Sequence, residues 1–230
     1  MKNKKLLMIF PIILIMLIIT GCKSENAQTT IKEDLLNINY KEDTNELELP
    51  QYETQNPVVA MYIENYGSIV MELYPDIAPN TVANFISLVK KGFYDNNTFH
   101  RLVPGFVLQG GDPTGTGTGG PGYTIKGEFS ANGYENNLKH EKGIVSMART
   151  SASNDTAGSQ FFIMLDKSEY LDGQYAAFGK IIDGWSNIEK IVANEKVANE
   201  NTGQLQKKLV IKKSVIDLNG KSYNEVEKIN

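Results

Sequence analysis

One short stretch of the chain combines a permanent cation, an amide and several apolar side chains. It runs from residue 99 to residue 112 and reads FHRLVPGFVLQGGD, with Arg101 and Gln109 as its polar groups. Because a guanidinium stays protonated, Arg101 acts only as a hydrogen-bond donor or an electrostatic anchor. The two extended runs, broken by Pro104 and Gly105, favour a hairpin. The stretch therefore predicts a small apolar pocket with two fixed polar groups, and a salt bridge from Arg101 to an acidic residue is the alternative.

Two other patterns that suggest chemistry have plainer explanations. His100 could serve as a general base with Asp112 or Ser146 as partners, but no G-x-S-x-G segment or cysteine nucleophile accompanies it. We therefore expect a structural, hydrogen-bonded histidine. Residues 115–120 read GTGTGG and match G-x-G-x-x-G, yet Pro-Gly follows where a dinucleotide-binding loop would begin a helix. We expect a glycine-rich surface turn there and no nucleotide.

The composition is typical of a globular protein with one main domain. The 230 residues carry a net charge of −4, and 41% of them are hydrophobic. A mildly acidic chain without a basic run beyond its N-terminus argues against a nucleic-acid partner. With two histidines and one cysteine, a zinc site is not expected. We expect neither a metal nor any other cofactor.

The N-terminus has the pattern of an export signal. Three lysines precede an apolar run of 14 residues from Leu6 to Ile19, which is short for a membrane span and typical of a signal-peptide core. The run ends in ITGC at 19–22, which resembles the lipobox of bacterial lipoproteins. Residues 1–21 are therefore interpreted as a cleaved signal peptide and Cys22 as a lipidated residue, at the extracytoplasmic face of the cell membrane. An uncleaved anchor helix and an ordinary secretory signal are the alternatives.

Residues 22–56 are predicted to form a flexible, lipid-anchored tether. They carry eight acidic residues against three lysines and have no sustained apolar period, so they bury too little surface to offset the entropy of ordering. A short helix over 31–38 is compatible with the pattern. The folded domain is predicted over residues 57–218, and residues 219–230 are predicted to be a polar tail.

The elements that must position the polar groups follow from the apolar periods. Residues 58–64 and 68–74 alternate around an Asn-Tyr-Gly turn and favour a hairpin. Helices are predicted over 79–91, between Pro79 and Gly92, and over 185–197 with Asp183 as the cap. Six further strands are predicted at 98–102, 106–110, 144–149, 161–165, 176–182 and 209–217. Many short strands with only two helices favour a closed or nearly closed antiparallel barrel over a βαβ sheet.

Further blocks follow the first stretch in a fixed order. They read GIVSMA at 143–148, GSQFFI at 158–163, LDG at 171–173 and FGK at 178–180. Together with residues 99–112 they resemble the signature of the cyclophilin family of peptidyl-prolyl cis/trans isomerases, over about residues 57–218. The resemblance implies an all-β fold, an eight-stranded antiparallel closed barrel capped by two α-helices. It also implies an enzyme that accelerates rotation about X-Pro bonds without a cofactor, here a monomer that acts on proline-containing exported polypeptides.

The resemblance also implies which residues form the site. Arg101 matches the catalytic arginine, and Gln109 matches the amide that holds the substrate backbone. The walls of the proline pocket match Phe106, Val107 and Phe162. The remaining positions expected to bind substrate are Phe99, Ala148, Arg149, Gln160, Tyr170, Leu171 and Tyr175.

Four of these positions depart from the family pattern. A methionine is replaced by Val107, an asparagine by Arg149, a tryptophan by Tyr170 and a histidine by Tyr175. We expect these changes to alter the preference for residues that flank the proline, and Tyr170 to weaken cyclosporin binding. They also leave a competing hypothesis, a module that holds proline-containing segments as a chaperone with little turnover.

Overall fold

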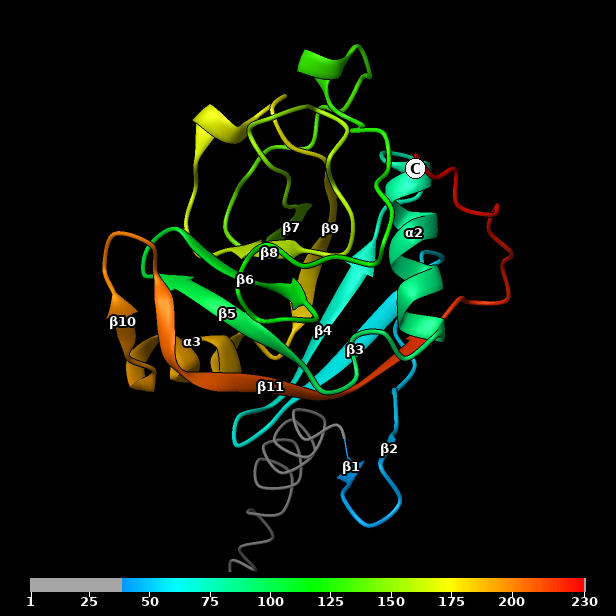
Figure 1. Ribbon diagram of the computed structural model, residues 1–230. Helices are drawn as coiled ribbons and strands as arrows, with labels where there is room; N and C mark the ends of the chain where they lie inside the picture. The colour runs from blue at the N-terminus through cyan, green and yellow to red at the C-terminus, as the bar shows by residue number, and fades with distance from the viewer. Residues whose placement is uncertain (1–38, 230) are drawn as a thin grey trace, which may run out of the picture.

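The computed structural model describes residues 39–229 of the chain (Figure 1). The predicted signal peptide, Cys22, the first part of the tether and the helix considered at 31–38 lie outside the described residues. Within residues 39–229, no helix has the length and apolar character needed to cross a membrane.

The predicted N-terminal hairpin of the domain is present. β3 (Val58–Ile63) and β4 (Gly67–Leu73) pair antiparallel. The turn between them places Asn65 at φ +67° and Gly67 at φ +96°, a left-handed region that asparagine and glycine tolerate better than other residues. The turn chemistry of the sequence therefore sets the register of these two strands.

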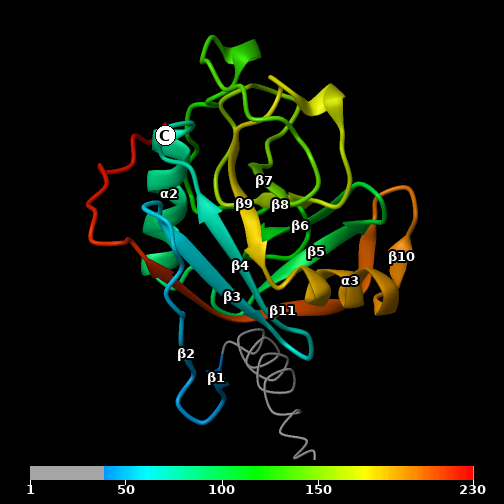
Figure 2. The same ribbon diagram turned by 180° about the vertical axis from the view of Figure 1, so that it is seen from behind.

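Eight antiparallel strands close into a barrel, as predicted (Figures 1 and 2). Their order is β11-β3-β4-β9-β7-β8-β6-β5, and a further pairing of β11 with β5 closes the ring. A short strand, β10 (Val197–Asn199), extends the sheet beyond β11. The remaining strands are β5 (Asn97–Val103), β6 (Val107–Asp112), β7 (Ile144–Met147), β8 (Phe161–Met164), β9 (Ala177–Asp183) and β11 (Gln204–Asp217).

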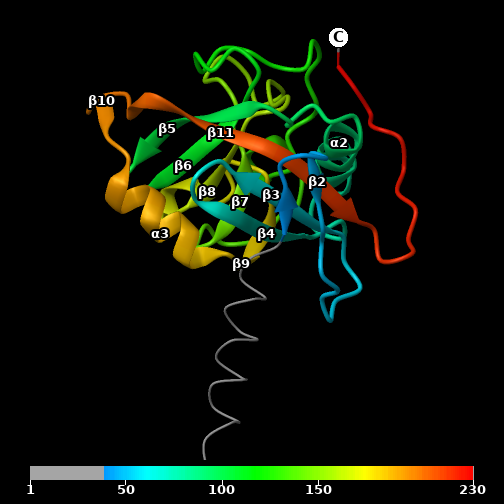
Figure 3. The same cartoon turned by 90° about the horizontal axis from the view of Figure 1, so that it is seen from below.

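Two helices lie at opposite sides of the barrel (Figures 1 and 3). α2 (Pro79–Lys90) begins at its proline, and Gly92 follows its end at φ +65°, as predicted. α3 (Trp185–Asn194) begins at Trp185 as predicted, but its cap and its end differ from the prediction. Its N-cap is Gly184 in a left-handed conformation rather than Asp183, and it stops before Val197 because that residue pairs with β11.

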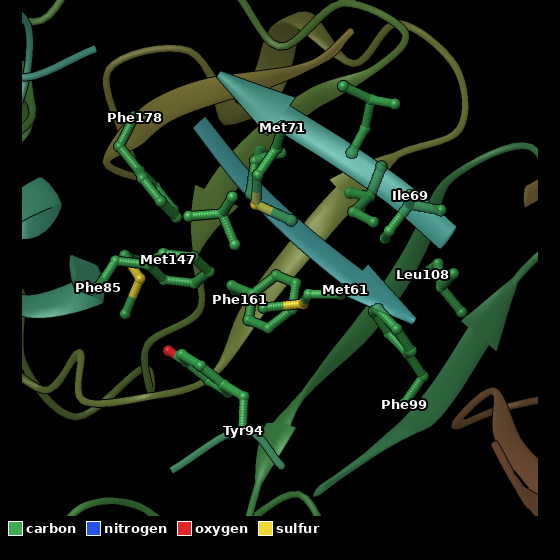
Figure 4. Close-up of a cluster of buried hydrophobic side chains, with 14 of the residues drawn as sticks. Met61, Ile69, Met71, Phe85, Tyr94, Phe99, Leu108, Met147, Phe161 and Phe178 are labelled. Carbon is green, nitrogen blue, oxygen red and sulfur yellow. The ribbon is translucent and has the colours of Figure 1, made fainter. Parts of the chain in front are cut away.

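The core of the barrel is rich in aromatic side chains, and α2 contributes one of them (Figure 4). The ring of Phe85 lies 5.0 Å from Tyr94, 5.3 Å from Phe161 and 5.1 Å from Phe178, measured between centroids. All four side chains are fully buried. Aromatic pairs at such distances add to the stabilisation from buried area, so this cluster fixes α2 on the barrel.

The described part of the predicted tether, residues 39–56, is packed on the barrel rather than free. β1 (Tyr40–Lys41) and β2 (Glu46–Leu47) form a small antiparallel hairpin next to β3 (Figure 3). The side chain of Leu47 is only 7% exposed, and the rings of Tyr40 and Tyr62 stack at 4.3 Å. The Tyr52 hydroxyl donates to Asp183 Oδ2 at 3.0 Å.

This difference from the prediction has a physical cause on the outer face of the sheet. Val58, Ala60 and Val70 point outward from β3 and β4 and are nevertheless buried, because Leu47 and its neighbours cover them. The apolar residues of 39–56 are spaced irregularly, so no helical or strand period reveals them. These residues cover an apolar patch on the outer face of β3 and β4, the face that a simple alternation along β3 would place in solvent.

Candidate active site

A β-bulge at His100 decides which way Arg101 points. Phe99 lies opposite Gly110 and Arg101 lies opposite Gln109, so His100 is an extra residue on β5. Side chains of a strand alternate between faces, and one inserted residue reverses the alternation. Phe99 is therefore wholly buried in the barrel core, while Arg101 is partly exposed beside Gln109.

Hydrogen bonds from two elements hold the guanidinium of Arg101. Its Nη1 donates to Gln109 Oε1 at 3.2 Å, and its Nε donates to the carbonyl of Thr202 at 2.8 Å, in the turn between β10 and β11. Burial lowers the pKa of Arg101, but a guanidinium remains charged near neutral pH. Among the described residues no carboxylate lies within 4 Å of it. Arg101 therefore does not form the salt bridge that was the alternative prediction, as far as residues 39–229 are concerned.

The amide of Gln109 connects Arg101 to the glycine-rich loop. Gln109 Nε2 donates to Gln160 Oε1 at 3.0 Å, and Gln160 Nε2 donates to the carbonyls of Gly117 at 3.0 Å and Gly119 at 2.9 Å. The loop at 115–120 is a turn, as predicted, with no helix after it. Its carbonyls fix the orientation of Gln160, and Gln160 in turn fixes Gln109.

Asp112 holds this loop in shape. The carboxylate accepts hydrogen bonds from the backbone of Thr114, Thr116 and Gly117 and from the hydroxyl of Thr114. Burial by itself raises the pKa of Asp112, but these hydrogen bonds outweigh it and keep the pKa well below its usual range. A Cβ at Gly119 would overlap the Asp112 carboxylate, so this position requires glycine.

Beside Arg101 lies an apolar cluster that contains most of the predicted pocket residues. Phe162, Val107 and Leu171 are buried in it, each no more than 5% exposed, and Phe106 lies at its edge. The guanidinium carbon of Arg101 lies 5.9 Å from the centre of the Phe106 ring. The other members are Ile144, Met164 and Ala177 inside, with Val103, Leu138, Ala148 and Tyr175 at the rim.

A buried polar chain that the sequence analysis missed supports Phe162. The ring of His140 stacks on Phe162 at 6.1 Å, its Nδ1 lies 3.1 Å from Asp172 Oδ1, and its Nε2 lies 3.0 Å from Ser146 Oγ. Burial lowers the pKa of His140, which keeps the ring neutral. Asp172 accepts from Nδ1–H, so Ser146 must donate to Nε2. Ser146 is paired with His140 rather than with His100, and no residue spacing in the sequence indicates that pairing.

The expected structural role of His100 needs one correction. Both ring nitrogens are buried and lack a hydrogen-bond partner among the described residues. The prediction of a hydrogen-bonded histidine is therefore wrong. Burial lowers the pKa of His100; the nearby charge of Asp112 raises it in part, and Arg101 opposes Asp112, so the pKa stays below its usual value. Phe99, predicted to bind substrate, packs against Phe161 in the core at 5.7 Å and lies apart from the other site residues.

A groove of about 290 Å³ continues from Gln109 and Gln160. Of the described residues that line it, only Arg149, next to Ala148, is charged. The guanidinium of Arg149 lies 4.8 Å from the Tyr175 ring, and its Nε donates to the Gln174 carbonyl at 3.0 Å. Tyr170, at the far side of the apolar cluster, is 69% exposed and stacks on Phe106 at 5.9 Å.

The structure thus brings together eleven of the twelve residues predicted for the site, and leaves Phe99 in the core. Among residues 39–229, no group of three His, Cys, Asp or Glu side chains is arranged to hold a metal ion. The arrangement offers an apolar surface, a fixed cation and a chain of amides. Such a site suits a change of conformation better than bond cleavage.

The barrel and this site define a family. The family model described as cyclophilin type peptidyl-prolyl cis-trans isomerase/CLD matches residues 58–216. The chain belongs to that family, and it is a peptidyl-prolyl cis-trans isomerase.

Particular relatives agree with this assignment. Peptidyl-prolyl cis-trans isomerase B of Bacillus subtilis is 53% identical over 138 residues, which are 60% of this chain and 92% of the relative. A peptidyl-prolyl cis-trans isomerase of Helicobacter pylori is 44% identical over 146 residues, 63% of this chain and 86% of the relative. A crystal structure of a cyclophilin type isomerase from Cryptosporidium parvum, in the presence of the dipeptide Ala-Pro, has a TM-score of 0.62 and 36% identity. It covers 70% of this chain and 98% of that one.

Proposed function

We propose that Arg101 drives isomerisation by donating a hydrogen bond to the prolyl nitrogen of an X-Pro bond. The observation that carries the proposal is a charged guanidinium that has no acidic partner within residues 39–229 and is held by Gln109 and Thr202 at the edge of an apolar cluster. The proline ring of the substrate packs against Phe106, Phe162 and their neighbours. The relative crystallised in the presence of Ala-Pro supports a proline-containing substrate.

The chemistry follows from the electronic structure of the amide. Resonance gives the C–N bond partial double-bond character and a barrier of roughly 18 to 20 kcal/mol. As the bond twists, conjugation is lost and the lone pair on the prolyl nitrogen becomes a better acceptor. A donor at that nitrogen therefore binds the twisted state more strongly than the planar one, which is the condition for catalysis.

The arginine alone is not sufficient for a fast isomerase. A hydrogen bond from a charged group is worth about 1.5 to 3 kcal/mol, which corresponds to about 10- to 150-fold in rate. Gln109 supplies a second effect by fixing the carbonyl of the residue before the proline. The apolar cluster supplies a third, because it holds the ring away from water while the bond rotates.

We further propose that the enzyme works as a monomer on exported polypeptides, tethered through a lipid on Cys22. The support is the ITGC sequence at the end of the apolar run. The change Cys22→Ser is expected to block processing or to release the protein from the cell surface. Retention of a normally processed Cys22→Ser protein at the membrane would contradict the anchor.

A refolding assay tests the proposed function against the competing chaperone hypothesis. The test substrate is a protein whose slow refolding phase is limited by proline isomerisation. An isomerase accelerates that phase at a small fraction of the substrate concentration, whereas a chaperone with little turnover acts only near stoichiometric amounts. Acceleration that requires equimolar protein, and that survives Arg101→Ala, would favour the chaperone.

A further inference from the structure

A second groove, which the isomerase site does not use, runs between α2 and the C-terminal segment 218–229. It has a volume of about 720 Å³. Its lining combines apolar side chains, among them Ile86, Leu218 and Val226, with a charged rim. The rim residues are Lys90, Lys91, Lys221 and Lys228, and Glu225 is the one acidic residue among the described residues that line the groove. We call this feature the cationic groove.

The lysines of the cationic groove are available for binding. All four are exposed, and none of them belongs to an ion pair within residues 39–229. Such a concentration of positive charge is notable in a chain whose net charge is −4. A cationic rim above an apolar lining is complementary to an acidic ligand that also carries apolar groups.

The C-terminal segment is fastened at both ends and arches away from α2 between them (Figure 1). At one end Asn219 Nδ2 donates to the carbonyl of Asn56. At the other, Asn80 exchanges two hydrogen bonds with the backbone of Glu227, at 2.9 and 2.8 Å. Along the arch, the buried hydroxyl of Tyr223 has no hydrogen-bond partner in the described part of the chain. The segment follows the last residue matched by the family model, 216, so one wall of the cationic groove lies beyond the matched part of the chain, while α2, the other wall, lies within it.

The cationic groove adjoins the groove that leads away from the isomerase site. Lys228 Nζ lies 4.4 Å from the centre of the Tyr123 ring, and Thr124 pairs with Ile229. Tyr123 and Thr124 also line the groove that begins at Gln160. A polypeptide that leaves the isomerase site along that groove therefore meets Lys228 next.

We propose that the cationic groove is a second substrate site, which binds acidic stretches of the polypeptide whose proline occupies the isomerase site. The proposal rests on the proposed function. The helix side, from Ala83 to Lys91, is about 12 Å long, which fits about four residues of extended chain. Alternate side chains of such a chain face opposite ways, so acidic groups meet the lysines while apolar groups meet the floor.

The test measures binding of a proline-free probe to the full chain in neutral detergent. The probe is a labelled octapeptide of alternating Glu and Leu. The triple variant Lys90→Gln, Lys91→Gln and Lys221→Gln should bind it about tenfold more weakly, since each exposed ion pair contributes a few-fold. Binding to the unchanged chain should also fall as salt is added. The matched control makes the same change of charge elsewhere, at Lys190, Lys207 and Lys208, and should leave binding intact.

A second measurement links the cationic groove to turnover. A proline peptide extended by the same acidic stretch should have a lower KM than one extended by Gln and Leu, and the triple variant should remove the difference. The triple variant should keep its activity on a short neutral proline peptide, because that peptide does not reach the cationic groove. If the unchanged chain itself lacks activity on that peptide, the proposed function is wrong, whatever the probe-binding experiment shows. Equal binding by both triple variants, or displacement of the probe by soluble phosphatidylglycerol without any effect of the extension on KM, would overturn the proposal.

Discussion

Arg101 owes its position to three neighbours that lie far apart in the sequence. The bulge at His100 turns it out of the core, Gln109 accepts from its Nη1, and the turn at Thr202 accepts from its Nε. Gln109 is itself held by Gln160 and the glycine-rich loop. The cation is therefore pre-organised before a substrate binds, which reduces the reorganisation needed in the transition state.

The change Gln109→Leu tests that pre-organisation. It removes the acceptor for Arg101 and the donor for the substrate carbonyl, and it puts an apolar side chain of similar size in place of the amide. We expect kcat/KM to fall about 10- to 100-fold, because hydrogen bonds to charged groups are worth about 1.5 to 3 kcal/mol. The melting temperature should change little, because Gln109 is only partly buried. An unchanged kcat/KM would mean that Arg101 is oriented without Gln109.

Arg149 is expected to set a preference for acidic residues near the proline. Within residues 39–229 it is the one charged residue that lines the 290 Å³ groove, and the Tyr175 ring and the Gln174 carbonyl hold it in place. In a peptide series with Glu or Gln at each position flanking the proline, Glu should raise kcat/KM up to about fivefold at one position. Arg149→Gln should abolish that preference and Arg149→Lys should keep most of it. A preference that survives Arg149→Gln would have to come from another cation.

At the level of single elements, local sequence patterns predict the strands and helices well. They do not predict the β-bulge in β5 or the docking of residues 39–56 on the barrel. The alternation in β3 and β4 and the proline and glycine at the ends of α2 are local signals, and the structure follows them. The bulge at His100, by contrast, depends on how β5 pairs with β6. The docking of residues 39–56 depends on an apolar patch formed by two strands. Neither has a signature within its own segment.

The docked segment 39–56 should stabilise the domain without affecting catalysis. Leu47→Ala should lower the free energy of unfolding by about 2 kcal/mol, because it removes a buried leucine from a small cluster at the surface. The activity per folded molecule should stay the same. Urea unfolding of Leu47→Ala beside the exposed control Glu42→Gln measures the effect. If the two variants unfold alike, the hairpin contributes nothing to stability.

At the scale of the whole molecule, the ordered motifs were sufficient to predict the barrel and most of the site, because the closed sheet brings those motifs together. Two kinds of contact could not be predicted from the sequence. The buried chain of Asp172, His140 and Ser146 joins three separate loops and strands, and the C-terminal segment meets α2 only in the folded state. Both depend on tertiary placement rather than on residue spacing.

The partly buried His100 and the buried His140 should make the whole domain less stable in mild acid. Burial lowers the pKa of both His100 and His140 in the folded state. Below about pH 6.5 the unfolded chain binds protons that the folded chain does not. The stability should therefore be complete above that pH and fall as the pH drops towards the lowered pKa values, by at most about 1.4 kcal/mol per pH unit for each histidine.

Urea unfolding between pH 7.5 and pH 5 measures this dependence. His100→Gln should make the slope shallower without a large loss of stability at pH 7.5, because the His100 ring nitrogens make no hydrogen bond to any of residues 39–229. The carboxylates of Asp112 and Asp172 have lowered pKa values, so they stabilise the folded state throughout this pH range. Their contribution is lost only at lower pH, and they therefore do not affect the slope measured here. The same slope with and without His100 would show that its ring is not neutral in the folded protein.

The most direct test of the central claim is the isomerase activity of Arg101 variants on one short proline peptide, with unfolding measured in parallel. Arg101→Ala should lose most of kcat/KM while the melting temperature stays near that of the unchanged chain. Arg101→Lys should recover only part of the activity, because an ammonium cannot donate to Gln109, Thr202 and the prolyl nitrogen in the same planar arrangement. A folded Arg101→Ala protein with undiminished kcat/KM would contradict the account.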